Sequence, residues 1–235
     1  MNLYLAEFLG TIFLVLLGDG VVANVSLSKS GMKGGNTVHI TLAWAAAVMI
    51  PAGIFGRVSG AHFNPALTIA LAINNGNWAV VPGYIISQML GAIVGAVLVW
   101  LLFKDHYNAE TDPGTILGTF STGPSIKNPP MNFISEVIAT FVLVFVIMNN
   151  PTDLVAGMGP MFVFILIMSL GMSFGGVTGY ALNPARDLGP RIAHAFLPIK
   201  NKGDSNWGYA WIPVCGPVVG GLLAALATSA IAWIF

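Results

Sequence analysis

Six stretches of the chain are almost entirely apolar, and each has about the 20 residues that a helix needs to cross the hydrocarbon of a bilayer. A backbone in lipid must satisfy its own hydrogen bonds, which only helices and closed barrels do. The short alternating segments typical of a barrel are absent. The pattern predicts an all-α membrane protein with six transmembrane helices. They cover roughly Leu3–Leu27, Val38–Phe55, Ala79–Phe103, Met131–Met148, Val155–Phe174 and Tyr209–Phe235.

The composition agrees with this class. Only 8% of the residues are charged and 56% are hydrophobic, whereas a soluble domain carries about 25% charged residues. A soluble enzyme is therefore excluded, and the net charge of zero offers no basic face for nucleic acid. The single cysteine, Cys215, excludes a disulfide framework. The histidines lack metal-ligand spacing and no phosphate-cradling motif occurs, so we expect no metal and no cofactor.

Two shorter stretches, Asn64–Ile73 and Asn183–Phe196, are too short to span the membrane, and both begin with Asn-Pro-Ala. Asparagine is among the best N-cap residues, and proline suits the first helical position. Half-helices in corresponding places of two halves point to a solute site near the bilayer midplane. The sequence therefore predicts two re-entrant half-helices.

The chain also repeats itself. The segment 59–66 (SGAHFNPA) is similar to 178–185 (TGYALNPA), and each half carries a glutamate at the head of a span, Glu7 and Glu136. Each half has three spans, an odd number, so the second half must be inserted upside down, as an inverted repeat. We expect a single channel domain over residues 1–235, with a first repeat at 1–103, a connecting loop at 104–130 and a second repeat at 131–235.

The chemistry of the two helix starts indicates a pore. Each exposes unsatisfied N–H donors and a partial positive charge of about half a unit. Two such ends that face each other disfavour a proton or metal cation, while the asparagine amides donate to a neutral oxygen and the loop carbonyls upstream accept. That arrangement describes a single-file route for hydroxyl-bearing molecules. One Asn-Pro-Ala alone is simply a helix cap, whereas two at repeat-related positions favour the pore.

At this point the sequence resembles the aquaporin superfamily, the major intrinsic proteins, over essentially the whole chain. The residues that carry the resemblance are 6–11 (AEFLGT), Ser59 to Ala66, and Asn183-Pro184-Ala185-Arg186-Asp187. The first Asn-Pro-Ala is Asn64, Pro65 and Ala66. Asp187 directly after Arg186 resembles the aquaglyceroporin (glycerol facilitator) branch. The resemblance implies six tilted helices with two half-helices, a homotetramer and one pore per subunit.

The resemblance also places the pore residues. It implies a selectivity filter of Trp44, Gly171, Tyr180 and Arg186. Gly171 stands where water-only channels carry a bulky histidine, so it would widen the pore. Tyr180 stands where phenylalanine is usual in the best-known glycerol facilitator, so its hydroxyl would make that corner more polar. The pore lining implied by the resemblance is Gly60, Ala61, His62 and Gly179.

Read without the resemblance, these residues have simpler interpretations. Trp44 fits a core or interface position, Gly171 fits close packing, and His62 fits a satisfied loop histidine. A charge in a membrane costs at least about 2.5–3.5 kcal/mol, so Arg186 needs a reason, and its structural alternative is a tie to a loop carbonyl.

Glu7 and Glu136 are expected to brace the re-entrant loops, because buried acids need partners. A proton relay through them is the alternative. Asp19, deep in the first span, has no repeat partner, and the sequence assigns it no role.

The predicted function is a passive channel, not an enzyme, for glycerol and related small neutral solutes, with some water permeation and exclusion of protons and ions. The first alternative is a facilitator of protonated lactic acid or urea. The alternative from a different class is an ion-coupled secondary transporter, which the inverted repeat and the two glutamates suggest. The sequence does not rank glycerol, water, lactic acid, urea and dihydroxyacetone.

Location and orientation give one conflict. The resemblance implies a multi-pass protein of the plasma membrane with both termini cytoplasmic. The loops after spans one, three and five hold all six lysines, whereas Arg57 lies on the opposite side, so the positive-inside rule would place both termini outside. Our expectation follows the resemblance. The lysines concerned are Lys29, Lys33, Lys104, Lys127, Lys200 and Lys202.

Overall fold

The computed structural model describes residues 2–150 and 158–231, and within these ranges all regular structure is helical. Six helices are long and apolar enough to cross a membrane, which confirms the six predicted spans. They are α1 (Leu3–Ser26), α2 (Thr37–Ser59), α4 (Val81–Leu102, preceded by the short 3-10 helix Trp78–Val80), α7 (Pro129–Met148), α8 (Gly159–Thr178) and α10 (Ile212–Ile231).

Two helices end four residues later than predicted, and glycines explain both. Helix α2 continues past Phe55 to Ser59 and stops because Gly60 adopts a left-handed conformation with φ 84°. Helix α8 continues past Phe174 to Thr178, where Gly179 ends it in the same way with φ 81°. The predicted start of this fifth span at Val155 lies outside the described residues.

Two half-helices lie between the long helices. They are α3 (Pro65–Asn75) and α9 (Pro184–Phe196), and both begin as predicted, immediately after an Asn N-cap and with Pro at the first position. The Asn64 side chain accepts a hydrogen bond from Ala66 N at 2.9 Å, and the Asn183 side chain accepts one from Ala185 N at 2.9 Å. The sequence places proline where its missing N–H costs nothing.

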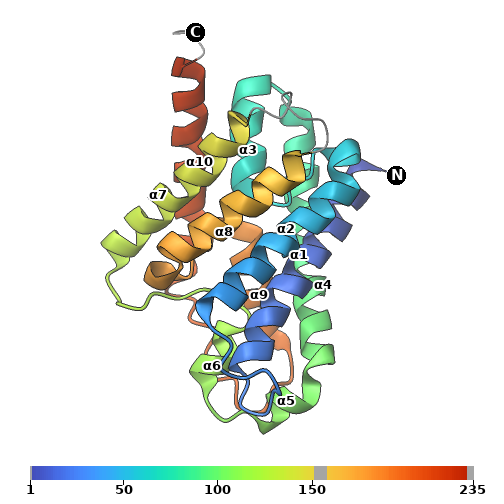
Figure 1. The fold of residues 1–235 in the computed structure, drawn as a ribbon, viewed down its shortest axis with the longest axis vertical. Helices are drawn as coiled ribbons and strands as arrows, with labels where there is room; N and C mark the ends of the chain where they lie inside the picture. Colours follow the sequence, from blue (N-terminus) through green and yellow to red (C-terminus); the bar gives the residue numbers. More distant parts are fainter. Residues whose placement is uncertain (1, 151–157, 232–235) are drawn as a thin grey trace.

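The connecting segment 104–130 is not simply a loop. It contains two short helices, α5 (Lys104–Ala109) and α6 (Pro113–Gly118), and α7 already begins at Pro129. Asp112 caps α6 by accepting from the backbone N–H groups of Gly114 and Thr115. Each helix has six residues, too few to display an apolar periodicity. In Figure 1 both lie at the lower end, near the end of α1.

The packing interlocks the two halves. Helix α1 packs on α4 and α7 packs on α10, while α2 against α8 joins one half to the other. The half-helices cross over, because α9 packs on α4 and α3 packs on α10 (Figure 1). Glycines permit the close approach: a Cβ at Gly91 would collide with the Phe8 carbonyl of α1, and one at Gly220 with the Val137 carbonyl of α7.

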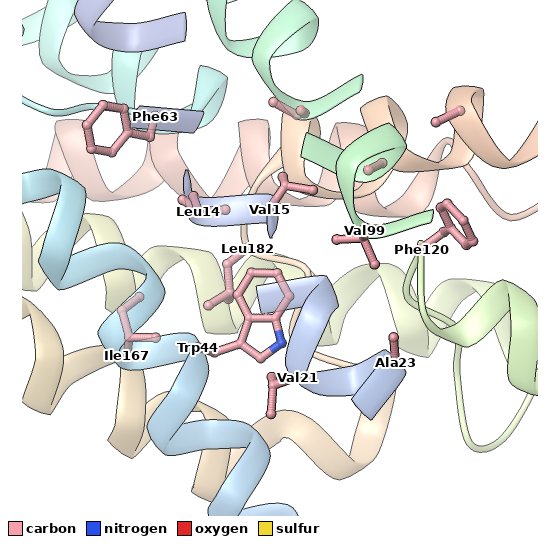
Figure 2. Packing of buried hydrophobic residues seen from close by; sticks show 14 of the residues in the cluster. Leu14, Val15, Val21, Ala23, Trp44, Phe63, Val99, Phe120, Ile167 and Leu182 are labelled. Atoms are coloured by element: carbon pink, nitrogen blue, oxygen red, sulfur yellow. The ribbon is translucent and has the colours of Figure 1, made fainter. Parts of the chain in front are cut away.

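The main apolar core joins residues from both halves of the chain. Figure 2 shows Trp44 reaching from α2 towards α1, within a cluster that includes Leu14, Val21 and Leu182. Trp44 is 5% exposed. The space for its ring exists because Gly18 of α1 has no side chain, since a Cβ there would overlap the indole.

Candidate functional site

The two Asn-Pro-Ala turns meet at the centre of the fold. Asn64 Nδ2 donates to the Leu182 carbonyl at 2.9 Å, and Asn183 Nδ2 donates to the Phe63 carbonyl at 2.8 Å. Each amide nitrogen carries two N–H groups, so one is used by the protein and the other remains. Both asparagines line the central cavity. The positive ends of two helices and two N–H donors therefore point at one place.

A buried glutamate stands behind each turn, in matching arrangements. Glu7 accepts from the Ser59 hydroxyl at 2.6 Å, from His62 N at 3.0 Å and from Phe63 N at 2.7 Å. Gln88 also donates to Glu7, at 2.8 Å.

The corresponding bonds of Glu136 come from the Thr178 hydroxyl at 2.6 Å and from the backbone N–H groups of Ala181 and Leu182, both at 3.0 Å. Both carboxylates are 0% exposed. Each one holds the backbone that precedes a half-helix, because it satisfies N–H groups that lack helical partners.

The backbone before each half-helix is unusual. Ala61 and Phe63 have φ values of 53° and 48°, and their counterparts Tyr180 and Leu182 have 39° and 57°. Left-handed residues of this kind cost of order 1–3 kcal/mol each and persist only where the surroundings enforce them. Among the described residues, no protein donor bonds to the carbonyls of Ala61, His62, Tyr180 or Ala181. Acceptors thus remain available beside the cavity.

The central cavity has a volume of about 300 Å³. Its wall combines polar groups with apolar side chains. The polar groups belong to the half-helix starts, the loops before them and Arg186, and the residues concerned are Gly60, Ala61, His62, Asn64, Tyr180, Ala181, Leu182, Asn183 and Arg186. The apolar lining includes Leu14, Trp44, Val48, Leu67, Leu71, Leu143, Ile147, Val163 and Ile167.

Arg186 and Trp44 are in direct contact at one end of this wall. The guanidinium carbon lies 4.0 Å from the centroid of the indole, a cation–π geometry. Arg186 Nη1 donates to Asp19 Oδ1 at 3.0 Å and lies 3.5 Å from the Phe120 carbonyl. Within the described residues, Nε and Nη2 have no protein acceptor. They are donors that a solute in the cavity can use.

Gly171 is not among the residues that line the cavity; it lies behind Tyr180. A Cβ at Gly171 would stand 2.6 Å from Thr41 Cγ2 and 3.0 Å from both Cζ and the hydroxyl oxygen of Tyr180. The glycine makes room for the tyrosine ring. The Tyr180 hydroxyl is buried and has no hydrogen-bond partner in the described part of the chain, so it does not present the polar corner that the sequence suggests.

His62 lines the cavity and its ring is held on two sides. Its Nδ1 lies 3.1 Å from the Thr68 hydroxyl, and the ring makes an edge contact with Tyr84, with centroids 4.9 Å apart. The Thr68 hydroxyl donates to the Asn64 carbonyl at 2.9 Å. Its oxygen is therefore the acceptor for Nδ1–H, and this tautomer leaves Nε2 as an acceptor.

Asp187 lies outside the cavity wall, in a buried ion pair. It accepts from Arg191 at 2.8 and 2.9 Å and from the backbone and hydroxyl of Thr122, both at 2.7 Å. Arg191 also donates to the Ser205 carbonyl at 2.8 Å. The pair ties α9 to the two segments that flank it. Other predicted residues outside the wall are Pro65, Ala66, Gly179, Pro184 and Ala185.

Two residues, Arg191 and Gln88, and one pairing, that of Asp19 with Arg186, are not predicted from the sequence. Arg191 has a detectable signal, because it follows Asp187 by four residues and so shares a helix face with it. Gln88, which bonds Glu7 and Thr68, had no local signal. The pairing of Asp19 with Arg186 has no local signal either, since 167 residues separate the two.

Outside the membrane, Glu110 ties the segment after α5 to the end of α1. It accepts from the backbone N–H groups of Ser28 at 2.7 Å, Thr111 at 2.9 Å and Asp112 at 3.1 Å. Desolvation acts to raise the pKa of this carboxyl, but the hydrogen bonds outweigh it and lower the pKa below its usual value.

Comparisons with known proteins agree with this geometry. The model of the family described as Major intrinsic protein matches residues 1–228. The glycerol uptake facilitator protein of Streptococcus pneumoniae (strain ATCC BAA-255 / R6) is 53% identical over 97% of this chain and 99% of its own length. The probable glycerol uptake facilitator protein of Thermotoga maritima is 49% identical over 100% of both chains. The X-ray structure of the aquaglyceroporin from Plasmodium falciparum superposes with a TM-score of 0.83 at 31% identity, covering 95% of this chain and 93% of that one.

Proposed function

The chain belongs to the major intrinsic protein family, and we propose that it is a passive channel for glycerol and related small neutral solutes, with some water permeation. It is a membrane channel and not an enzyme. Relatives at about half identity carry the name glycerol uptake facilitator. The observation that carries the proposal is the mixed lining of the cavity, in which polar groups occur together with apolar side chains.

A polyol carries the same two kinds of group, polar and apolar, as the cavity lining. Its hydroxyl groups meet the donors of Arg186, Asn64 and Asn183 and the free carbonyls beside them, while its CH groups meet Trp44 and the apolar side chains. Each donor or acceptor replaces a hydrogen bond to water that the solute gives up on entry. We assign the selectivity filter to Trp44, Tyr180 and Arg186, with Gly171 as the residue that positions the Tyr180 ring.

Exclusion of ions rests on the centre of the cavity. The two half-helices begin beside Asn64 and Asn183, and their N-terminal partial charges are positive, so a cation at this point is repelled. A proton carried by a chain of waters meets the same potential. Glu7 and Glu136 are fully engaged in holding backbone, which supports a bracing role rather than a proton relay.

The further proposals concern the setting of the channel. We place it in the plasma membrane with both termini cytoplasmic, and assign it a homotetramer with one pore per subunit. Six crossings, an even number, place both termini on the same side of the membrane. Protease accessibility of the termini in sealed vesicles tests the orientation, because the lysine distribution favours the opposite one.

A solute panel on proteoliposomes tests the function. Shrinkage and re-swelling measured by light scattering should show glycerol entry well above that of empty vesicles, and Arg186→Ala should change glycerol and water permeation by different factors. Equal factors would contradict the filter assignment. Dihydroxyacetone, urea and lactic acid at falling pH complete the panel. Uphill uptake driven by an ion gradient would indicate a coupled transporter instead.

A further inference from the structure

Asp19 reaches the filter from the middle of α1, and the proposed function gives it no part. It is 1% exposed, and its Oδ1 lies 3.0 Å from Arg186 Nη1. Its Oδ2 is buried and has no partner among the described residues. Building on the proposed channel function, we propose that Asp19 is a specificity-determining residue. It supplies the counter-charge that makes the filter electrically neutral and so makes the channel reject anions.

The local packing holds Asp19 and Arg186 in one assembly with Trp44. The Trp44 ring lies against Gly18, the residue next to Asp19 on α1. Arg186 lies on that same ring, with its guanidinium carbon 4.0 Å from the centroid. One turn of α1 therefore supports the ring and fixes one nitrogen of the guanidinium. Nε and Nη2 remain as donors to the cavity, because Asp19 bonds only Nη1.

The other carboxylates near Arg186 already have partners of their own. Asp187, adjacent to Arg186 in sequence, forms its ion pair with Arg191 at 2.8 Å. Glu136 bonds Thr178 and two backbone N–H groups. In the part of the chain that the structure describes, Asp19 is the only acidic residue that forms a salt bridge with Arg186. Neutralisation of the filter thus depends on this one residue.

The sign of the effect follows from the charges along the cavity. The starts of the two half-helices are positive and already repel cations. An unpaired Arg186 would add a full positive charge at the filter, and both features would then attract an anion into a site of low dielectric, where charges act strongly. With Asp19 in place, an anion loses its hydration and gains little attraction in return. Only neutral solutes then find a favourable path.

Three planar, Y-shaped solutes of similar size separate charge from size: nitrate, urea and guanidinium. Their fluxes into proteoliposomes are measured relative to water flux, which normalises for the number of active channels. Asp19→Asn keeps an oxygen for Arg186 Nη1 but removes the charge. We expect the nitrate-to-water ratio to rise by roughly tenfold or more, with the urea-to-water ratio within about twofold of the parent. Asp19→Glu, which keeps the charge, should leave nitrate excluded.

The double variant Asp19→Asn with Arg186→Gln distinguishes charge from loosening. If Asp19 acts through the charge of Arg186, nitrate flux in the double variant returns to the low level of the parent, because the filter is again neutral. Nitrate flux that persists there would show a loosened pore and overturn the proposal. An unchanged nitrate ratio in Asp19→Asn would also overturn it, since a protonated Asp19 would already behave as asparagine.

A second measurement tests the proposal even if Asp19→Asn inserts poorly into the membrane. Arg186→Gln leaves Asp19 unpaired at the filter, so the guanidinium-to-water ratio should rise by roughly tenfold; no rise would overturn the proposal. The glycerol flux of the parent tests the channel function separately. A parent that passes water but no glycerol would refute the glycerol assignment, while the nitrate-to-water ratio would still decide the role of Asp19.

Discussion

Asn64 and Asn183 each donate a side-chain N–H to the carbonyl of the residue immediately before the other, at 2.9 and 2.8 Å. Each side-chain oxygen at the same time caps its own half-helix. The pair therefore joins two helix starts that come from opposite halves of the chain. These four hydrogen bonds hold the two asparagine side chains in place, so their remaining N–H donors stay aligned towards the cavity.

Loss of one member of this pair should destabilise the fold. Asn64→Ala removes the cap of α3 and leaves the buried Leu182 carbonyl without its donor, so we expect a loss of about 2–4 kcal/mol in unfolding free energy. Thermal unfolding in detergent measures it. Asn74→Ala, on the same helix but with only an exposed bond to Ser229, is the matched control. Equal losses in the two variants would contradict the role of the pair.

Gly171 should control the position of the Tyr180 ring. In Gly171→Ala the new methyl group would stand 3.0 Å from that ring and 2.6 Å from Thr41, so the ring moves towards the cavity. We expect glycerol flux to fall by about tenfold, which corresponds to roughly 1.4 kcal/mol of added barrier, and water flux to fall less. Gly176→Ala on the same helix has open space around it and should change neither flux.

The Tyr180 hydroxyl should lower the free energy of unfolding. It is buried with no partner among the described residues, so Tyr180→Phe is expected to raise the unfolding free energy by about 1 kcal/mol. The ratio of glycerol to water flux should stay unchanged, because the hydroxyl is not exposed to the cavity. A changed ratio with unchanged stability would show that the hydroxyl contacts the solute.

Removing one partner of the Asp187–Arg191 pair should destabilise the fold. Asp187→Ala leaves Arg191, which is 0% exposed, without its carboxylate, and we expect a loss of about 3–5 kcal/mol. Asp105→Ala, at an exposed site on α5, is the control and should change little. The double variant Asp187→Leu with Arg191→Met should recover part of the loss, because no unpaired charge remains buried. Thermal unfolding of the three variants tests this.

Glu110 should make a pH-dependent contribution to the stability of the fold. Its pKa is lowered in the folded state, so the stability it adds is present above the unfolded pKa of about 4.3 and is lost as the pH falls through the lower folded value. Glu110→Gln should therefore lower the melting temperature at pH 7 and have a shrinking effect below about pH 4. Asp105→Asn is the control. A difference from the parent that stays constant with pH would refute this linkage.

The sequence predicts the spans and half-helices well because their causes are local. Apolar length sets α1 and α4, and an Asn cap followed by proline sets α3 and α9. The short helices α5 and α6 have no signal in the sequence, since six residues carry no period. Helices α2 and α8 end four residues later than the sequence predicts, because only the φ values of Gly60 and Gly179 reveal which glycine stops the helix.

The site divides along a similar line. Asn64, Asn183 and Arg186 stand out in the sequence. A helix cap that occurs twice and an arginine within a membrane segment are both rare enough to be noticed without a structure. Gly171 lies behind the filter instead of on the cavity wall, a position that depends on where the Tyr180 ring rests. The partners of Glu7 also required the fold, since His62 and Gln88 lie 55 and 81 residues away.

The six membrane crossings and the two capped half-helix starts follow from local sequence, because hydrophobic length and helix capping act over a few neighbouring residues. Which charges meet depends on the tertiary fold. Asp19 is uninterpretable in the sequence, yet it lies 3.0 Å from Arg186. Ion pairs depend on distance in space, and the folding of two interlocked halves sets that distance.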